Sequence, residues 1–407
     1  MAKQEKWLGP GENTHEFFAH IRQRGMDDLV EIRNQIKTAK GDGEHRAERT
    51  WGAQQAAAMI NRSPQWLRDN DPEVPRNEAG HGRWTLERII QLMEQAGERY
   101  QRPSGSTAKV LAMSKFKGGV GNSTNTLHLA HGLAMKGQKV LVWDWDAQAT
   151  STTGAGGVVP DAELVDEDLP LYAMTIDPEA IIDPNSEIVR GTYFHNVDLV
   201  PANSALNELE LTLITQHLHG SSESKTDITA EFRMAAILNY IKEFYDVILI
   251  DCPPALGMNT MNALLAADGV ITSVKPELFD RASLVAYTDA LAEMCSNYDK
   301  DYSYFRILIS QFQDGINTDY KGRSQESGHR GGEIALRKIY GDAVLENMMY
   351  HSKEIANASS ELSTVLANDK PVGSRGAYKR AVAVVNGVVD EVFSDLKRIW
   401  ESERDDD

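Results

Sequence analysis

A ten-residue stretch rich in glycine and lysine, residues 115–124, is the part of the sequence best suited to chemistry. It reads Lys-Phe-Lys-Gly-Gly-Val-Gly-Asn-Ser-Thr. Its glycines, Gly118, Gly119 and Gly121, let backbone N–H groups turn inward toward an anion. Ser123 is placed to offer a hydroxyl to Mg²⁺. The stretch therefore predicts a phosphate-binding loop with an associated metal.

The segments on either side of this loop support the prediction. Residues 110–113 are apolar and indicate a short buried strand. Leucine and alanine then recur at helical spacing from Leu127 to Ala134 and stop at Gly137. A helix that begins directly after the loop adds its free N–H groups and the positive end of its dipole. Strand, turn and helix together predict a cradle for phosphate.

The loop departs twice from the strict P-loop pattern G-x-x-x-x-G-K-[ST]. Phe116 stands where the first glycine is expected, and Asn122 stands where the lysine is expected. A glycine turn in any α/β protein is the alternative interpretation of these ten residues taken alone.

Three aspartates follow two further apolar runs. Asp144 and Asp146 end the run that begins at Val140, and Asp251 ends the run that begins at Tyr245. On a strand the first two carboxylates point to opposite faces, and beside a phosphate loop one can reach the metal or its waters. Two solvated loop acids are the alternative. Asp251, at the end of a buried parallel strand, suits Mg²⁺ binding through the metal's waters.

The alternation of strands and helices predicts an α/β fold with a doubly wound, mostly parallel sheet. Ligands bind such sheets at the carboxyl ends of the strands, where Pro276 and Glu277 follow one of them. The other expected elements are strands at 197–201, 269–274 and 306–310, helices at 228–244 and 378–400, and an acidic, irregular segment at 154–195.

A different pattern precedes this sheet. Residues 14–38 have apolar side chains at near-helical spacing and predict one helix. Such a helix can pair with a copy of itself or pack on its own domain, and the pattern favours neither.

Residues 50–70 predict a helix-turn-helix. A helix of small residues is followed by a short turn and by a second helix that Ser63 caps and Pro64 opens. Gln65 and Arg68 would then face a DNA groove. Residues 76–84, which include Arg83, are basic and glycine-rich and suggest a hairpin wing. A plain αα-hairpin in a helical bundle is the alternative.

Composition narrows the class of protein. The 407 residues carry a net charge of −18, and residues 1–108 are neutral overall, so the excess lies in 109–407. Any DNA contact must therefore use local basic patches, such as Arg375, Lys379 and Arg380. The two cysteines make no disulfide framework or zinc site. No apolar run has the length of a membrane span, and we expect a cytoplasmic protein with no membrane partner.

The motifs together resemble the ParA-type partition ATPases of the MinD/ParA superfamily. The resemblance covers roughly residues 109–400. In this superfamily the P-loop is deviant, with a signature lysine that comes early, here Lys117. A small winged helix-turn-helix domain in front is similar to that of the longer ParA proteins, and residues 197–201 and 378–381 look like the partition ATPase of repABC-type replicons. The supporting segments are residues 117–123, Asp144-x-Asp146-x-Gln148 and Tyr245-Asp246-x-Ile248-x-Ile250-Asp251-x-Pro253-Pro254.

The resemblance implies a role for each matching residue. ATP or ADP would be held by the loop and near its base, with Lys117 and Asp146 in catalysis and Mg²⁺ held by Ser123, Asp144 and Asp251. Lys117 would reach the phosphates of the opposite subunit in an ATP-bound homodimer, and Asp146 would orient the attacking water. Ala147 stands where members of this family usually have a proline, between Asp146 and Gln148. The nucleotide-binding residues implied are Lys117, Gly118, Gly119, Val120, Gly121, Asn122, Ser123, Thr124, Pro276 and Glu277.

The resemblance also implies partners and a domain plan. The dimer would bind DNA, so the protein would be associated with the nucleoid. A ParB-type centromere-binding protein would stimulate ATP hydrolysis. The helix-turn-helix would repress the protein's own operon. The DNA-binding residues expected from the helix-turn-helix, its wing and the basic cluster are Gln65, Arg68, Arg83, Arg375, Lys379 and Arg380. The expected units are 1–48 (helix, possible dimerisation), 49–102 (helix-turn-helix), 103–108 (linker) and 109–407 (ATPase).

One rival interpretation belongs to a different class of protein. Family members also carry the second P-loop lysine, which Asn122 replaces here. The chain could therefore be a DNA-binding transcriptional regulator whose nucleotide site is weakened or inactive. A MinD-like membrane ATPase fits less well, because that class needs a basic amphipathic C-terminal helix and this chain ends in three aspartates.

Overall fold

The computed structural model describes most of the chain. The described residues are 14–40, 47–164, 188–219, 228–314, 316–318, 324–326, 328–371 and 373–405. Most of the segment expected to be acidic and irregular, and the end of the acidic tail, lie outside the described residues.

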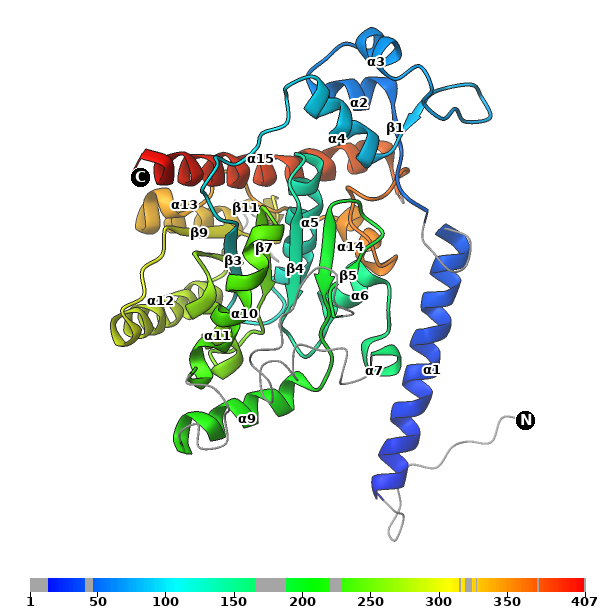
Figure 1. Ribbon diagram of the computed structural model, residues 1–407. Coiled ribbons are helices and arrows are strands. Elements are labelled where there is room, and N and C mark those ends of the chain that lie inside the picture. The colour runs from blue at the N-terminus through cyan, green and yellow to red at the C-terminus, as the bar shows by residue number, and fades with distance from the viewer. Residues whose placement is uncertain are drawn as a thin grey trace, which may run out of the picture.

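A seven-stranded sheet forms the centre of the molecule (Figure 1). Its strand order is β5-β6-β4-β7-β3-β8-β9, and β5 is antiparallel to β6 while the other neighbours are parallel. The predicted doubly wound, mostly parallel sheet is confirmed. Its strands are β3 (Lys109–Ser114), β4 (Val140–Asp144), β5 (Arg190–Gly191), β6 (Val197–Val200), β7 (Val247–Asp251), β8 (Gly269–Val274) and β9 (Tyr304–Ile309).

Helices cover both faces of the sheet, because alternate side chains of each strand enter different cores. In β3, Leu111 and Met113 join one hydrophobic cluster while Val110 and Ala112 join the other. The helices of this domain are α5 (Asn122–Met135), α6 (Thr150–Gly156), α7 (Pro160–Glu163), α9 (Leu206–His219), α10 (Arg233–Ile241), α11 (Met258–Ala266), α12 (Leu278–Tyr298), α13 (Gly328–Tyr340), α14 (Lys353–Ser360) and α15 (Arg375–Asp405).

Three expected elements differ in type or by several residues. The helix expected at 228–244 is α-helical only in α10, with 3₁₀ turns at 230–232 and 242–244, because tertiary packing sets helix ends more than propensity does. The segment expected to be irregular contains the end of α6 and the whole of α7. The last helix is longer than expected and runs over Arg375–Asp405.

The predicted helix pair at 50–70 is present. It comprises α2 (Ala53–Ile60) and α3 (Pro64–Asn70), and the Ser63 hydroxyl caps α3 by accepting from the Trp66 N–H at 3.1 Å. The strands β1 (Trp51–Gly52) and β2 (Arg83–Trp84) then pair before α4 (Leu86–Gln95). An antiparallel bridge between Arg76 and Gly82 makes a small hairpin between α3 and β2.

This small helical unit lies against α15, the long helix that crosses between it and the sheet (Figure 1). The ring of Tyr100 lies 5.8 Å from that of Phe393 and 6.0 Å from that of Trp400, measured between ring centroids. The amide of Gln138 donates to the Tyr100 carbonyl at 3.0 Å. These contacts join the segment before the sheet to both α15 and the turn after α5.

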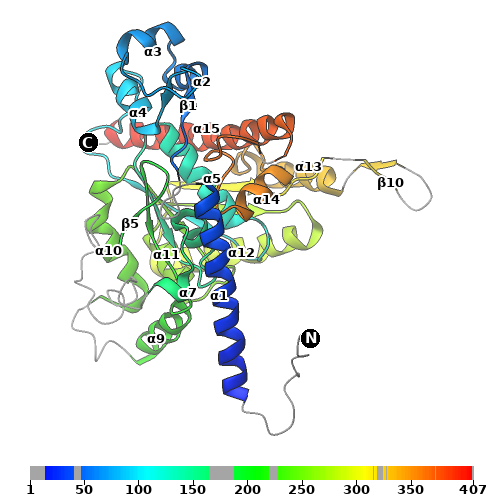
Figure 2. The same cartoon turned by 90° about the vertical axis from the view of Figure 1, so that its right-hand side faces the viewer.

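The first helix, α1 (Thr14–Lys40), stands beside the domain and extends well beyond it (Figures 1 and 2). Arg33 pairs with Glu163 of α7. Phe18, Ile21 and Leu29 are exposed. A short hairpin of β10 (Ile316–Thr318) and β11 (Ser324–Glu326) projects elsewhere from the domain (Figure 2). None of the helices in the described part of the chain has the length and apolar character needed to traverse a lipid bilayer.

Candidate functional site

The glycine-rich loop lies between the end of β3 and the start of α5, as expected. Gly119 and Gly121 have φ of +76° and +82°, values that favour glycine. The side-chain amide of Gln311, which follows β9, donates to the Gly119 carbonyl at 3.2 Å. A Cβ at Gly121 would lie 3.2 Å from that same amide nitrogen. The turn is therefore both glycine-dependent and tied to a neighbouring strand.

The first turn of α5 is anchored under this loop by a buried amide. Asn125 Nδ2 donates to the hydroxyl of Ser273, at the end of β8, and to that of Ser310, just after β9, at 3.1 and 3.0 Å. The start of α5 is thereby held over the carboxyl ends of two strands, where free N–H groups can meet an anion.

Asn122 turns its amide inward, toward the sheet. Its Nδ2 donates to the carbonyl of Met113 at 2.6 Å and to Asp251 Oδ1 at 3.0 Å. An amide NH₂ has two hydrogens, so both are committed and neither is left for a phosphate. The residue is 2% exposed, and within the described part of the chain its Oδ1 atom has no hydrogen-bond partner.

Asp251 ends β7 and is the centre of a hydrogen-bond network. Besides the Asn122 amide, it accepts from the Ser151 hydroxyl at 2.7 Å, and a hydrogen bond from Ser123 favours its charged form. Burial raises the pKa of Asp251, and the nearby charge of Lys115 opposes that rise. A buried carboxylate among hydroxyls is suited to a cation.

Asp144 ends β4 directly beside Asp251 in the parallel register. Its Oδ2 atom accepts from both the N–H and the hydroxyl of Thr152, each at 2.7 Å, and its Oδ1 atom accepts from the Asp146 N–H at 3.3 Å. Burial, and then the neighbouring Asp251 carboxylate, raise the pKa of Asp144. Because its oxygens already hold the loop after β4, Asp144 supports the site more than it faces a ligand.

Asp146 lies beside a buried lysine. Lys115 Nζ is 3.3 Å from Asp146 Oδ2, and both side chains are at least nine-tenths buried. The other oxygen of Asp146 accepts from the Gln148 N–H at 3.0 Å. The carboxylate expected to orient water is thus held by a cation that the sequence analysis did not single out.

Lys117 pairs with a different carboxylate. Its Nζ atom donates to Asp280 Oδ2, in the first turn of α12, at 2.7 Å, and this bond raises the pKa of Lys117. The Lys117 side chain is 46% exposed, whereas that of Asp280 is 2% exposed. Lys117 is therefore held by a contact within the chain, with half of its side chain exposed.

Pro276 and Glu277 lie where expected, between β8 and α12. The Pro276 carbonyl packs so closely on Gly332 that a Cβ there would come within 1.8 Å of it. Glu277 faces His329 of α13, with Oε1 3.5 Å from Nε2. These two residues join the start of α12 to α13.

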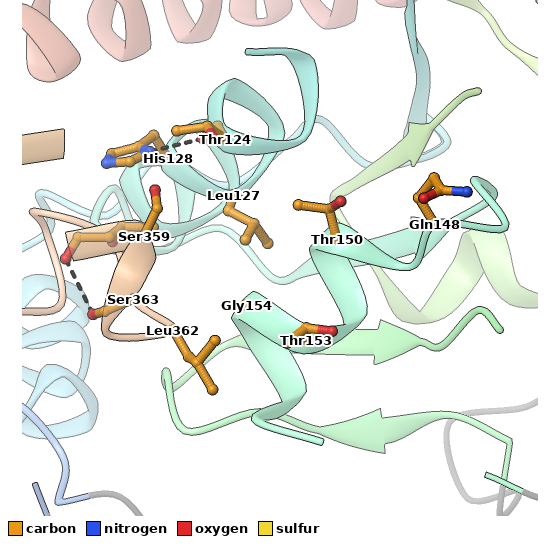
Figure 3. A pocket seen from close by; sticks show the side chains of 11 residues that line it. Thr124, Leu127, His128, Gln148, Thr150, Thr153, Gly154, Ser359, Leu362 and Ser363 are labelled. Atoms are coloured by element: carbon orange, nitrogen blue, oxygen red, sulfur yellow. Dashed lines mark hydrogen bonds between the residues drawn. The ribbon is translucent and has the colours of Figure 1, made fainter. Parts of the chain in front are cut away.

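A cavity of about 240 Å³ opens beside the first turns of α5, between α5, α6 and the end of α14 (Figure 3). Thr124 is at one edge and Gln148 at another. None of the residues that line it belongs to the loop 117–123, so it adjoins the phosphate site without forming it. His128 lies in its wall, where its Nδ1–H donates to the Thr124 carbonyl at 2.7 Å and its Nε2 accepts from the Val365 N–H at 3.2 Å.

The residues at this edge fit Mg²⁺ in the way phosphate-bound magnesium is usually held. No cluster of three or more His, Cys, Asp or Glu side chains able to hold a metal occurs among the described residues. Magnesium at phosphate sites typically takes one or two carboxylates together with substrate phosphates and waters. Asp251, the Ser123 hydroxyl and the unpartnered Asn122 Oδ1 supply suitable hard oxygen atoms.

The residues predicted to contact DNA lie in two places. Gln65 and Arg68 are exposed on α3, and Arg68 donates to Gln65 at 2.8 Å. Arg83 lies against its own chain, donating to Thr50 Oγ1 at 3.0 Å and lying 3.8 Å from Asp369. At the second place, the start of α15, the exposed residues are Arg375, Lys379 and Arg380.

Sequence reasoning missed several residues of the site. Lys115, Asn125 and Asp280 are polar residues adjoining predicted strand ends or loops, and only tertiary contacts reveal their partners. Ser151 and Thr152 could have been found from their position shortly after Asp144 and Asp146, because a loop that returns to a strand end brings small hydroxyl residues near its carboxylates.

Comparison with known proteins gives the family of the chain. A family model described as an AAA domain matches residues 108–302. The chain is 31% identical to a putative replication protein A of Sinorhizobium fredii over 308 residues, 74% of this chain and 70% of that protein.

Two solved structures share the fold. A structure titled as a partition protein aligns with a TM-score of 0.64, 16% identity and coverage of 95% of this chain and 99% of that one. Cobyrinic acid a,c-diamide synthase of Mycobacterium smegmatis, with bound ADP and magnesium, aligns with a TM-score of 0.53, 21% identity and coverage of 73% and 97%.

The fold and site define a P-loop NTPase with a deviant phosphate loop. This chain belongs to the ParA-type partition ATPase family.

The buried imidazole of His128 should make stability depend on pH. Burial lowers its pKa to about 4, so the fold accepts only the neutral ring. The unfolded chain, with an ordinary value near 6.5, binds a proton that the folded state does not. Stability present above pH 6.5 is therefore lost as the pH falls toward 4, by up to about 3 kcal/mol.

Urea unfolding at pH 7 and at pH 4.5 tests this. His128→Gln should reduce the loss of unfolding free energy between the two pH values, and His81→Gln, at an exposed position, is the control. Equal losses in the wild type and in His128→Gln would contradict the assignment.

Proposed function

We propose that this protein is a DNA partition ATPase that binds ATP or ADP with Mg²⁺ and forms a homodimer on ATP. The observation that carries the proposal is the meeting of the loop 117–123 with Asp251, through Asn122 and Ser123, at the carboxyl edge of a parallel sheet. Asp146 is held at the same edge by Lys115. Nucleotides bind at this edge in open α/β sheets. Bound ADP and magnesium in a synthase of the same fold support the choice of ligand.

The chain's own residues have separate tasks in this proposal. Backbone N–H groups of the loop and of the start of α5 bind the phosphate oxygens, and the Ser123 hydroxyl and the Asp251 carboxylate hold the metal. Magnesium, when bound, neutralises charge that develops on the phosphates. Asp146 orients the attacking water and accepts its hydrogen bond. Pro276 and Glu277 line the base end of the site.

Lys117 serves the homodimer in this proposal. It now bonds Asp280 of its own chain, and on dimerisation it exchanges this partner for a phosphate of the opposite subunit. Because Asp280 is buried and Lys117 is half-exposed, the lysine is the partner able to move. The exposed apolar residues of α1, Phe18, Ile21 and Leu29, give the dimer a second place to pair.

DNA binding is the second part of the proposal. The helix α3 would read an operator and repress the protein's own operon, and the start of α15 would hold nucleoid DNA without sequence preference. Arg375, Lys379 and Arg380 lie in the first turns of α15, where positive charge opposes the helix dipole. Because these three cations do not stabilise the helix at its start, contact with DNA phosphates explains their position better. A ParB-type partner would then stimulate hydrolysis and release the DNA.

One observation favours a second candidate, a transcriptional regulator with an inactive nucleotide site. Both hydrogens of the Asn122 amide bind inside the protein, so the loop lacks the usual cation at this position. ATP binding and turnover, measured with and without DNA and the partner, separate the two. DNA-stimulated turnover supports the ATPase, and operator binding without any nucleotide binding supports the regulator.

Arg68→Ala should weaken operator binding. If Arg68 reads a base, its loss should cost roughly 1–3 kcal/mol of binding free energy and relax specificity. Fluorescence anisotropy with operator and random duplexes measures both. Arg22→Ala, which removes an exposed arginine from α1, is the matched control. Unchanged operator affinity in Arg68→Ala would place the recognition helix elsewhere.

Neutralising Arg375, Lys379 and Arg380 to glutamine should flatten the salt dependence of non-specific DNA binding. Each lost phosphate contact lowers the slope of log affinity against log salt by about 0.9. Filter binding over a salt series measures the slope. The control neutralises three other exposed cations, Arg22, Lys338 and Lys353. The same slope in both triple variants would show that the start of α15 does not contact DNA.

Asn122→Lys should raise ATP turnover by more than it raises ATP affinity. Ground-state binding rests mainly on the backbone N–H groups, the Ser123–Mg²⁺ contact and the cations already present. Hydrolysis needs more, because charge shifts on the phosphoryl oxygens in the transition state. Steady-state turnover and nucleotide titration of both proteins test this. Equal turnover in wild type and variant would mean that another cation already fills the position.

A further inference from the structure

The carboxyl edge of the sheet concentrates negative charge. Asp144, Asp146 and Asp251 are all buried there, and Asp144 and Asp251 are opposite each other in the register of β4 and β7. Buried like charges are unfavourable unless a cation or a proton offsets them. A nucleotide would add further negative charge to the same place.

One cation is buried with these acids. Lys115 is 7% exposed, and its Nζ atom is 3.3 Å from Asp146 Oδ2. Its charge also favours the ionised form of Asp251, although burial has the larger effect on that group. An ammonium is rarely buried unless it is paired, so this lysine is held inside by the acids that it neutralises.

Neither Lys117 nor Asn122, the two loop positions expected to carry the charge, supplies it to this cluster. Asn122 is neutral, and its amide bonds the Met113 carbonyl and Asp251. Lys117 is charged, but it bonds Asp280 on α12 and is half-exposed. Lys115 follows the last residue of β3, so it enters the acid cluster from the strand instead of from the loop.

We propose that Lys115 supplies the buried positive charge that P-loops usually take from a lysine at the position of Asn122. In this role it binds the terminal phosphate of a nucleoside triphosphate, exchanging Asp146 for phosphate oxygen and leaving Asp146 free to bind water. The inference rests on the proposed nucleotide site and adds a charge-bearing residue to it. Asn122 has a separate place in this arrangement, with its amide beside Asp251.

The test compares binding of fluorescent ATP and ADP analogues, with Mg²⁺, to purified full-length variants. Lys115→Met removes the charge and keeps the length, and Lys115→Arg keeps the charge. Lys109→Met is the matched control, because Lys109 is also buried and ion-paired, with Glu403, but lies at the opposite end of β3. Thermal unfolding of each variant without nucleotide is recorded alongside.

The expected result is a loss of ATP affinity in Lys115→Met of about tenfold or more, the equivalent of one charge-assisted hydrogen bond. ADP affinity should fall less, because the terminal phosphate is missing. Lys115→Arg should retain much of the ATP affinity, and Lys109→Met should retain all of it. A change that only loosened the fold would weaken ATP and ADP binding equally.

A double variant guards against misfolding of Lys115→Met. Adding Asn122→Lys returns a cation to the cluster from the loop side, so Lys115→Met with Asn122→Lys should fold and recover ATP affinity. Asn122→Lys should therefore raise affinity more in the Lys115→Met protein than in the wild type. Equal gains in the two backgrounds would overturn the proposal.

Two negative outcomes have different meanings. If the wild type binds ATP and Lys115→Met binds it equally well, Lys115 has no part in binding the phosphate and the nucleotide site stands. If the wild type and Asn122→Lys bind no nucleotide at all, the proposed site itself is wrong and the role of Lys115 is overturned with it.

Discussion

The structure depends on balancing charge at one edge of a parallel sheet. Parallel strands bring their carboxyl ends together, so Asp144 at the end of β4 and Asp251 at the end of β7 must lie side by side. Both are buried, and the pKa of each is raised by burial. The surrounding structure offsets this with hydroxyl and N–H donors from the loop after β4 and with the ammonium of Lys115.

The buried acids explain how the loop accommodates Asn122 in place of the usual P-loop lysine. The neutral amide of Asn122 donates to a strand carbonyl and to a carboxylate at once. A lysine at this position would carry its ammonium on a longer side chain, so its contacts would have a different geometry. The loop has its glycine conformation at Gly119 and Gly121, so the backbone cradle forms without a lysine at position 122. Backbone geometry and side-chain charge are thus separate properties of this phosphate loop.

The long helix α15 connects the site to the rest of the chain. It packs on α5, whose Gly132 lies so close to Val389 that a Cβ there would come within 2.3 Å. It also receives the ring of Tyr100 from the segment before the sheet. The helix α5, which begins at the phosphate loop, therefore packs on the same long helix whose first turns are proposed to contact DNA.

The sequence by itself determined the sheet, the loop and the positions of Asp144, Asp146, Asp251 and Ser123, because buried strands and glycine turns have strong local patterns. It also placed the helix pair at 50–70. Only the tertiary structure decided which cation serves which acid. Lys115 and Lys117 are two residues apart in the same stretch, yet one enters the acid cluster and the other bonds Asp280, 163 positions away. Such pairings depend on which strand ends and helices meet, and the local sequence carries no signal for distant partners.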